Sequence, residues 1–189
     1  MQLKKETLRE IVRDKRVLFI TTKNIDYIRN TQELRILKEV ASSVEVVSSD
    51  KKNYILRVLA VWRQITKEKV QKNDIIFVGF APQLIIPFVG GRLKQRLIVI
   101  DFFISVYDTL ICDRKKFKAG GLISKMCHKL DENTLKKANH VITDTKAHAE
   151  FFVSEFNGEK NIFETIYLEA DPTIYYQRPQ KKSASLKDK

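Results

Sequence analysis

The chain has 189 residues, of which 43% are hydrophobic, and it carries 35 Lys and Arg against 23 Asp and Glu, a formal net charge of +12. This length supports one well-formed core and excludes two large domains, and the 11 Phe and 6 Tyr exclude an intrinsically disordered chain. The basic excess favours anionic partners such as nucleic acid, acidic lipid or phosphorylated molecules, although solvated lysine-rich faces would give the same total.

Short apolar runs alternate with amphipathic segments along the chain. Val17 to Ile20 is the first predicted strand, and a helix begins near Asn30, with Glu33 as its capping-box partner. The alternation continues through strand 44–47, helix 54–70, strand 75–78, a short helix after Pro82, strand 97–100, helix 122–138, strand 140–143, helix 146–156 and strand 162–168.

This order of elements predicts an α/β protein: a Rossmann-like open, mostly parallel sheet with helices on both faces. From Gln177 onward the sequence loses its apolar pattern and becomes polar and basic. We therefore predict one domain over residues 1–176 and a basic linker or disordered tail over residues 177–189.

Targeting and membrane signals are weak. The first 16 residues are charged throughout and lack the apolar region of a secretory signal, and no window approaches the roughly 18 apolar residues of a spanning helix. The two cysteines, Cys112 and Cys127, cannot form a disulfide framework. The expected location is the cytoplasm, with peripheral attachment to the inner face of a membrane left open.

Polar residues directly after the predicted strands are the candidate site residues, because ligands of open parallel sheets bind at the carboxyl ends of the strands. Asp144 with Thr145 is better explained as a helix N-cap, and Asp171 before Pro172 equally as a turn. The full set comprises Thr22, Lys23, Asn24, Asp26, Phe80, Ala81, Gln83, Asp101, Ser105, Asp108, Asp144, Thr145, Glu169 and Asp171.

Asp101 is the strongest of these candidates. It directly continues the apolar run 98–100, where an unpaired buried carboxylate would be costly and would have a raised pKa. We predict a catalytic or positioning role for Asp101, with Asp108 lining or capping the same cleft. Arg114 is predicted to pair with Asp101 or to bind a phosphate, although Asp113 beside it equally allows a surface pair.

Several common kinds of site lack their motif. No G-x-G-x-x-G follows the first strand, and neither G-x-x-x-x-G-K-[ST] nor G-x-S-x-G occurs. The three histidines, His128, His140 and His148, have no metal-ligand spacing with the cysteines. We therefore expect no metal site, no P-loop and no conventional Ser or Cys hydrolase.

Three segments resemble family 4 of the glycosyltransferases, which have the GT-B fold. They are DFFISVYDTLICDRK (101–115), LDENTLKKANHVITDTKAHAEFF (130–152) and IYLEADPTIYY (166–176). The last is similar to the family's V-x-x-G-A-D-x-x-x-F, with Glu169 where Gly is usual. The loop after the first strand also lacks the paired glycines common in the family. The similarity spans residues 16–176, nearly the whole predicted domain.

The resemblance implies the N-terminal, acceptor-side domain of a transferase that moves a sugar, with retention, from a nucleotide sugar to a glycan or lipid-linked acceptor. The donor would be held mainly by a C-terminal domain or subunit with a Glu-x7-Glu motif, so the chain is expected to be inactive alone. The nucleotide sugar is a substrate, and no cofactor is expected.

The resemblance also suggests roles for individual residues. Asp101 would orient the acceptor hydroxyl, and Lys23 and Glu169 would contact the donor. The expected acceptor-binding residues are Asn24, Asp26, Ser105, Asp108, Arg114 and Lys115.

The net charge and the apolar run Leu84–Phe88 would suit docking on an anionic membrane surface. The alternative from another class is a non-catalytic, basic Rossmann-like module that binds nucleic acid or serves regulation. Aromatic residues interleaved with lysines on an exposed strand would favour nucleic acid. Here the aromatic residues fall mostly in apolar segments, so nucleic acid is the less favoured partner.

Overall fold

The computed structural model describes residues 6–93 and 95–169. The predicted tail over residues 177–189, the domain boundary at residue 176 and the candidate Asp171 lie outside the described residues. The elements, in chain order, are α1 (Leu8–Val12), β1 (Arg16–Ile20), α2 (Ile28–Val40), β2 (Ser43–Val47), α3 (Tyr54–Gln64), α4 (Lys67–Lys72), β3 (Ile75–Val78), the 3-10 turn η1 (Pro82–Leu84), α5 (Ile86–Val89), β4 (Leu97–Asp101), the π-helix η2 (Asp108–Asp113), α6 (Leu122–Leu135), β5 (His140–Thr143), α7 (Lys146–Phe156), the 3-10 turn η3 (Lys160–Ile162) and β6 (Phe163–Thr165).

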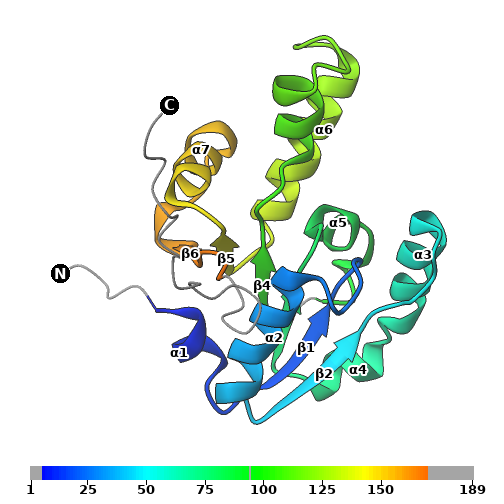
Figure 1. The fold of residues 1–189 in the computed structure, drawn as a ribbon, viewed down its shortest axis with the longest axis vertical. Coiled ribbons are helices and arrows are strands. Elements are labelled where there is room, and N and C mark those ends of the chain that lie inside the picture. The colour runs from blue at the N-terminus through cyan, green and yellow to red at the C-terminus, as the bar shows by residue number, and fades with distance from the viewer. Residues whose placement is uncertain (1–5, 94, 170–189) are drawn as a thin grey trace, which may run out of the picture.

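The six strands form one open sheet in the order β2-β1-β3-β4-β5-β6, and every pair is parallel (Figure 1). The chain first moves outward from β1 to β2 and then crosses back to β3 on the other side of β1. The strand order therefore reverses between β1 and β3, and this is the point where such sheets open a crevice at their carboxyl ends. The predicted Rossmann-like α/β fold is confirmed.

Alternate residues of each strand enter two separate cores, because successive side chains of a strand point to opposite faces. Val17 and Phe19 of β1 pack with α1 and α2 on one face, whereas Leu18 and Ile20 pack with α3 to α7 on the other (Figure 1). The same alternation holds in β3 and β4.

The predicted strands 75–78 and 140–143 and the predicted helix 146–156 match the structure residue for residue. The predicted helix 54–70 is wrong in one respect, because it breaks at Ile65–Thr66 into α3 and α4. Thr66 there becomes an N-cap that accepts a hydrogen bond from Lys69 N, while Ile65 is fully buried. The last predicted strand is shorter than expected and spans only Phe163–Thr165.

The predicted capping box at Asn30 and Glu33 is wrong. Helix α2 begins two residues earlier, with Tyr27 as an N-cap that makes no side-chain cap hydrogen bond. Asn30 and Glu33 therefore lie within the helix, and both side chains are buried. They face the sheet, where they contribute to the cluster described below.

Arg16 and Asp74 fasten the amino ends of β1 and β3. Asp74 accepts hydrogen bonds from the backbone N and the guanidinium of Arg16, and these bonds lower the pKa of the Asp74 carboxyl to about 2. Because the folded-state pKa lies below the unfolded value, this stabilisation is complete above pH 3.8 and is lost as the pH falls toward 2.

We predict that Asp74→Asn lowers the free energy of unfolding at neutral pH by about 1 kcal/mol, a value discounted for the partial exposure of the pair. Urea titrations of both proteins at neutral and acidic pH measure the difference. It should shrink toward zero at the acidic end. A difference that does not change with pH would contradict the assignment.

Candidate functional site

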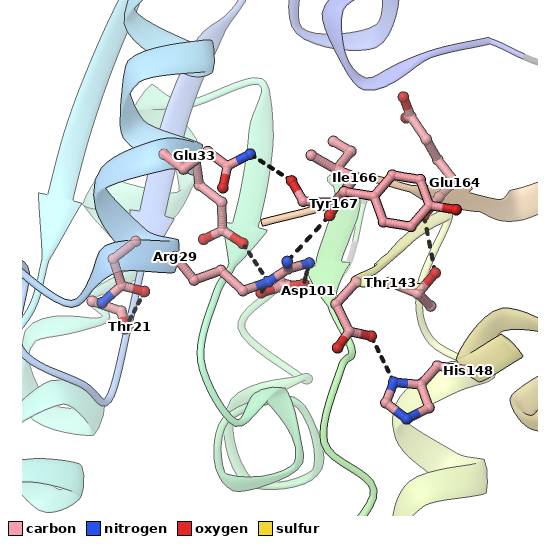
Figure 2. A network of polar contacts seen from close by, with 12 residues as sticks. Thr21, Arg29, Glu33, Asp101, Thr143, His148, Glu164, Ile166 and Tyr167 are labelled. Atoms are coloured by element: carbon pink, nitrogen blue, oxygen red, sulfur yellow. Dashed lines mark hydrogen bonds and ion pairs between the residues drawn. The ribbon is translucent and has the colours of Figure 1, made fainter. Parts of the chain in front are cut away.

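A buried ion pair joins α2 to the carboxyl end of β4. Arg29 Nε lies 2.5 Å from Asp101 Oδ2 and Arg29 Nη2 lies 2.6 Å from Oδ1, a two-pronged geometry that only arginine provides. The residues are 5% and 1% exposed. Asp101 is the last residue of β4 rather than the first beyond it, and strand alternation turns it, like Val99, toward α2 (Figure 2).

The carboxyl ends of the three neighbouring strands β1, β3 and β4 all lie against polar side chains of α2. Asp101 of β4 meets Arg29, and Thr21 after β1 donates to Asn30 Oδ1 at 3.3 Å. A Cβ placed on Gly79 after β3 would lie 3.2 Å from Glu33 Oε2 and 3.2 Å from Phe19 Cζ. Glycine at position 79 therefore gives Glu33 room to lie over the end of β3.

Glu33 is the unusual member of this cluster. It lies one helical turn from Arg29, with Oε1 3.8 Å from Arg29 Nε, and neither carboxyl oxygen has a hydrogen-bond partner among the described residues. Burial raises the pKa of Glu33 well above its usual value, and the nearby negative charge of Asp101 raises it further. The cluster thus combines one guanidinium, one carboxylate and one carboxyl whose pKa is raised.

Helix α2 also holds the segment that follows β6. Arg29 Nη1 donates to the Ile166 carbonyl at 3.2 Å, Gln32 Nε2 donates to the Tyr167 carbonyl at 2.8 Å, and Gln32 Oε1 accepts from Glu169 N at 3.2 Å (Figure 2). Arg35 adds an exposed ion pair with Glu169. Arg29 therefore ties the end of β4 to the segment that follows β6.

An aromatic cluster with one cation lies beside the point where the strand order reverses. The Phe80 ring, after β3, lies 5.6 Å from the Tyr27 ring and 5.8 Å from the Phe103 ring. Lys23 Nζ lies 5.4 Å from the Phe80 ring and 5.6 Å from the Tyr27 ring, and Arg29 packs on Phe103 at 4.9 Å. We call Lys23, Tyr27, Phe80 and Phe103 the aromatic cradle. All four are half-buried, so a ligand can reach them.

Asp131 of α6 fixes the turn that follows β4. Its carboxylate accepts hydrogen bonds from Ser105 Oγ at 2.7 Å and from the backbone N of Tyr107 at 2.8 Å, and Val106 N and Gln83 Nε2 complete the set. Burial raises the pKa of Asp131, and these donors oppose the shift. Ser105 is thus buried and engaged inside the protein.

The other predicted site residues fall into separate places. Asn24 and Asp26 are exposed in the loop after β1, Glu169 is exposed and paired with Arg35, and Lys23 lies in the aromatic cradle. Arg114 and Lys115 are exposed in the segment that joins η2 to α6. Asp108 begins η2 and is half-buried. Of the alternatives predicted for Arg114, pairing with Asp101 is wrong, because Asp101 pairs with Arg29.

After β5, Thr145 caps α7 by accepting a hydrogen bond from His148 N, which confirms the N-cap explanation. Asp144 Oδ1 lies 2.6 Å from His148 Nδ1, a contact on the opposite side of Asp101 from α2 (Figure 2). Among the described residues, no group of three or more His, Cys, Asp or Glu side chains is arranged to hold a metal ion.

Sequence reasoning missed Arg29, Glu33 and Asp131. The first two share a helix face with Leu37, at positions i, i+4 and i+8, and Asp131 shares one with Cys127 and Leu135. Charged residues at the spacing of a buried apolar stripe are the signal that would have found all three.

Among solved structures, the chain is similar to that of Anabaena Alr3699/HepE in complex with UDP and glucose. The two are 13% identical, with a TM-score of 0.50, and the match covers 87% of this chain and 47% of that chain. The fold is that of one half of a GT-B protein. The chain spans about half the length of the structure it matches, and no protein-family model and no curated protein matches it.

We predict that Arg29→Met lowers the free energy of unfolding by about 3–5 kcal/mol, because it leaves the buried Asp101 carboxylate unpaired. The matched control is Arg35→Met, which removes an exposed ion pair and should cost less than about 1 kcal/mol. Urea denaturation measures both. Equal losses for the two variants would show that the buried pair does not hold the carboxyl edge together.

The raised pKa of Glu33 gives a second prediction. Above pH 4.5, the ordinary glutamate value, the unfolded chain loses this proton and the folded chain retains it, so rising pH destabilises the fold until the folded-state pKa is passed. Glu33→Gln cannot ionise. The stability of this variant relative to the native chain should therefore increase as the pH rises from 4.5 toward neutrality, and a constant difference would rule out the buried protonated carboxyl.

Proposed function

We propose that this chain is the N-terminal, acceptor-side domain of a glycosyltransferase that moves a sugar from a nucleotide sugar to a glycan or lipid-linked acceptor. The observation that supports this most is the likeness over 87% of the chain to a structure bound to UDP and glucose. Because the match spans 47% of that structure, a donor-binding C-terminal domain or subunit would supply the other half. The chain alone would then be inactive.

The aromatic cradle is the best place for the acceptor. It lies at the reversal of strand order between β1 and β3, where α/β sheets of this kind bind their ligands. Aromatic faces at such a site offer apolar contact area to a sugar ring. Lys23, packed against Phe80 and Tyr27, supplies a positive charge for a phosphate oxygen of the donor or of a lipid carrier.

In this proposal Asp101 is a positioning residue. Both of its carboxylate oxygens accept hydrogen bonds from Arg29 and it is only 1% exposed, so it has no geometry for taking a proton from an acceptor hydroxyl. It holds Arg29 under Phe103 instead, and Arg29 in turn fixes the carbonyl of Ile166. The ion pair thereby sets the shape of the carboxyl edge against which the acceptor rests.

The chemistry asks little of a nucleophilic side chain. The bond between the anomeric carbon and the diphosphate oxygen breaks, the acceptor oxygen forms the new bond to that carbon, and the hydroxyl proton leaves with the diphosphate. Retention of configuration is part of the proposal. Catalysis then depends on holding the acceptor hydroxyl against the anomeric carbon and on stabilising the departing charge, which is why an acceptor half needs a donor half to act.

The proposal predicts selective binding by the chain. An undecaprenyl-diphosphate-linked sugar in detergent should bind, and UDP-glucose should bind at least tenfold more weakly because most of its contacts belong to the other half. Phe80→Ala and Lys23→Ala should each weaken acceptor binding by roughly tenfold, the loss of about 1.4 kcal/mol. Calorimetric titration measures the affinities.

Lys160→Ala provides the control. Lys160 lies in η3, directly before the edge strand β6, and is therefore separated from the cradle at β1 and β3 by the strands β4 and β5. This variant should bind the acceptor as the native chain does. Tighter binding of random-sequence RNA than of any glycan would instead favour the non-catalytic binding module. Equal effects of the Lys160 and Lys23 substitutions would remove the aromatic cradle from the proposal.

A further inference from the structure

The segment from Arg114 to Met126 joins η2 to the first turn of α6, and we call it the tip. Figure 1 shows η2 and α6 side by side, projecting away from the sheet farther than any other part of the described chain. The tip emerges on the carboxyl side of β4, because it follows that strand and precedes the helix that returns to β5. It therefore stands on the same side of the sheet as the aromatic cradle.

The tip exposes large apolar side chains. Leu122 is 77% exposed, Met126 is 62% exposed, and Ile123 and Phe117 are each at least 40% exposed. Leu122 and Met126 lie four residues apart on α6 and so share one face of the helix, with Ile123 beside them. Contiguous exposed apolar groups of this kind mark surfaces that contact something other than water.

Basic residues surround this apolar set. Arg114, Lys115, Lys116, Lys118 and Lys125 are all exposed, and Asp113 is the one acidic residue between positions 113 and 126. Within the part of the chain that the structure describes, no ion pair involves any of these five basic side chains. Their charge is therefore available to an external anionic surface.

This combination fits a lipid surface better than a protein surface. Lysine is depleted in protein–protein interfaces, and a second copy of the chain would bring like charges together. At a bilayer, in contrast, apolar side chains enter the boundary between headgroups and acyl chains while lysines reach anionic headgroups with their stems lying along the apolar layer.

We propose that the tip docks this protein onto an anionic lipid surface, with Leu122, Ile123 and Met126 inserted and the lysines bound to headgroups. This inference rests on the proposed function, because a lipid-linked acceptor would be met at a membrane surface. Within the run Leu84–Phe88, which was expected to suit membrane docking, Ile85 and Ile86 are fully buried and Phe88 is 60% exposed, so the tip offers more exposed apolar side chains than that run. No helix of the described residues is long and apolar enough to cross a bilayer, so the contact would be interfacial.

Vesicle flotation tests the proposal with the full chain. Vesicles of phosphatidylcholine with phosphatidylserine should carry the protein, pure phosphatidylcholine vesicles should carry much less, and high salt should release it. Leu122→Ser/Met126→Ser and Lys115→Glu/Lys118→Glu should each reduce the bound fraction at least tenfold, given about fivefold for each basic residue near the surface. The second variant changes a loop, so it keeps the test valid if the first fails to fold.

The matched control is Leu97→Ser, which removes an exposed apolar side chain, 38% exposed, from the amino end of β4, the opposite edge of the sheet from the tip. It should leave vesicle binding unchanged. The proposal is wrong if the tip variants bind vesicles like the native chain, or if the control variant loses as much vesicle binding as they do. It is also wrong if the native chain is a dimer that the tip variants convert to monomers. Vesicle binding needs no sugar transfer, so this failure is distinguishable from failure of the transferase proposal.

Discussion

The bidentate pair between Arg29 and Asp101 is the interaction on which the carboxyl edge of this sheet depends. One guanidinium satisfies both oxygens of a buried carboxylate, stacks on Phe103 and holds the carbonyl of Ile166. Removing either charge would leave the other uncompensated in a site with almost no access to water. Burial and the charge of Asp101 raise the pKa of the nearby Glu33 well above its usual value, which favours its neutral form in this cluster.

The sheet itself could be predicted because its strands are nearly uninterrupted apolar runs, as parallel strands buried on both faces must be. Strands such as 75–78 and 140–143 need no other information. The cluster at their carboxyl ends could not be predicted in the same way. Asn30 and Glu33 have the spacing of a capping box, and only the start of α2 at Ile28 shows that they face the sheet. Asp101 was predicted as a site residue from its position after an apolar run. Its partner, Arg29, lies 72 residues earlier. Arg29 can be identified only from the alternation of side chains along β4 and from the face of the sheet on which α2 packs.

The fold places three surfaces in a simple relation. The aromatic cradle lies at the reversal of strand order, and the Arg29 cluster supports it from the α2 side. The tip projects from the sheet on the carboxyl side of β4 (Figure 1). A tip seated on lipid would turn the carboxyl edge toward the bilayer. A lipid-linked acceptor could then reach the cradle without leaving the membrane, which would account for a basic, apolar projection on the same side as the site.

Amide chemical-shift mapping of the isotope-labelled chain tests whether the carboxyl edge between β1 and β4 binds the acceptor. Titration with a diphosphate-linked sugar in detergent should move resonances of the loops after β1, β3 and β4, with Lys23, Phe80 and Phe103 among the largest changes. Detergent alone should move the tip and leave those loops unchanged. Shifts confined to the amino ends of the strands, or spread evenly over the basic surface, would show that the acceptor does not bind at the carboxyl edge.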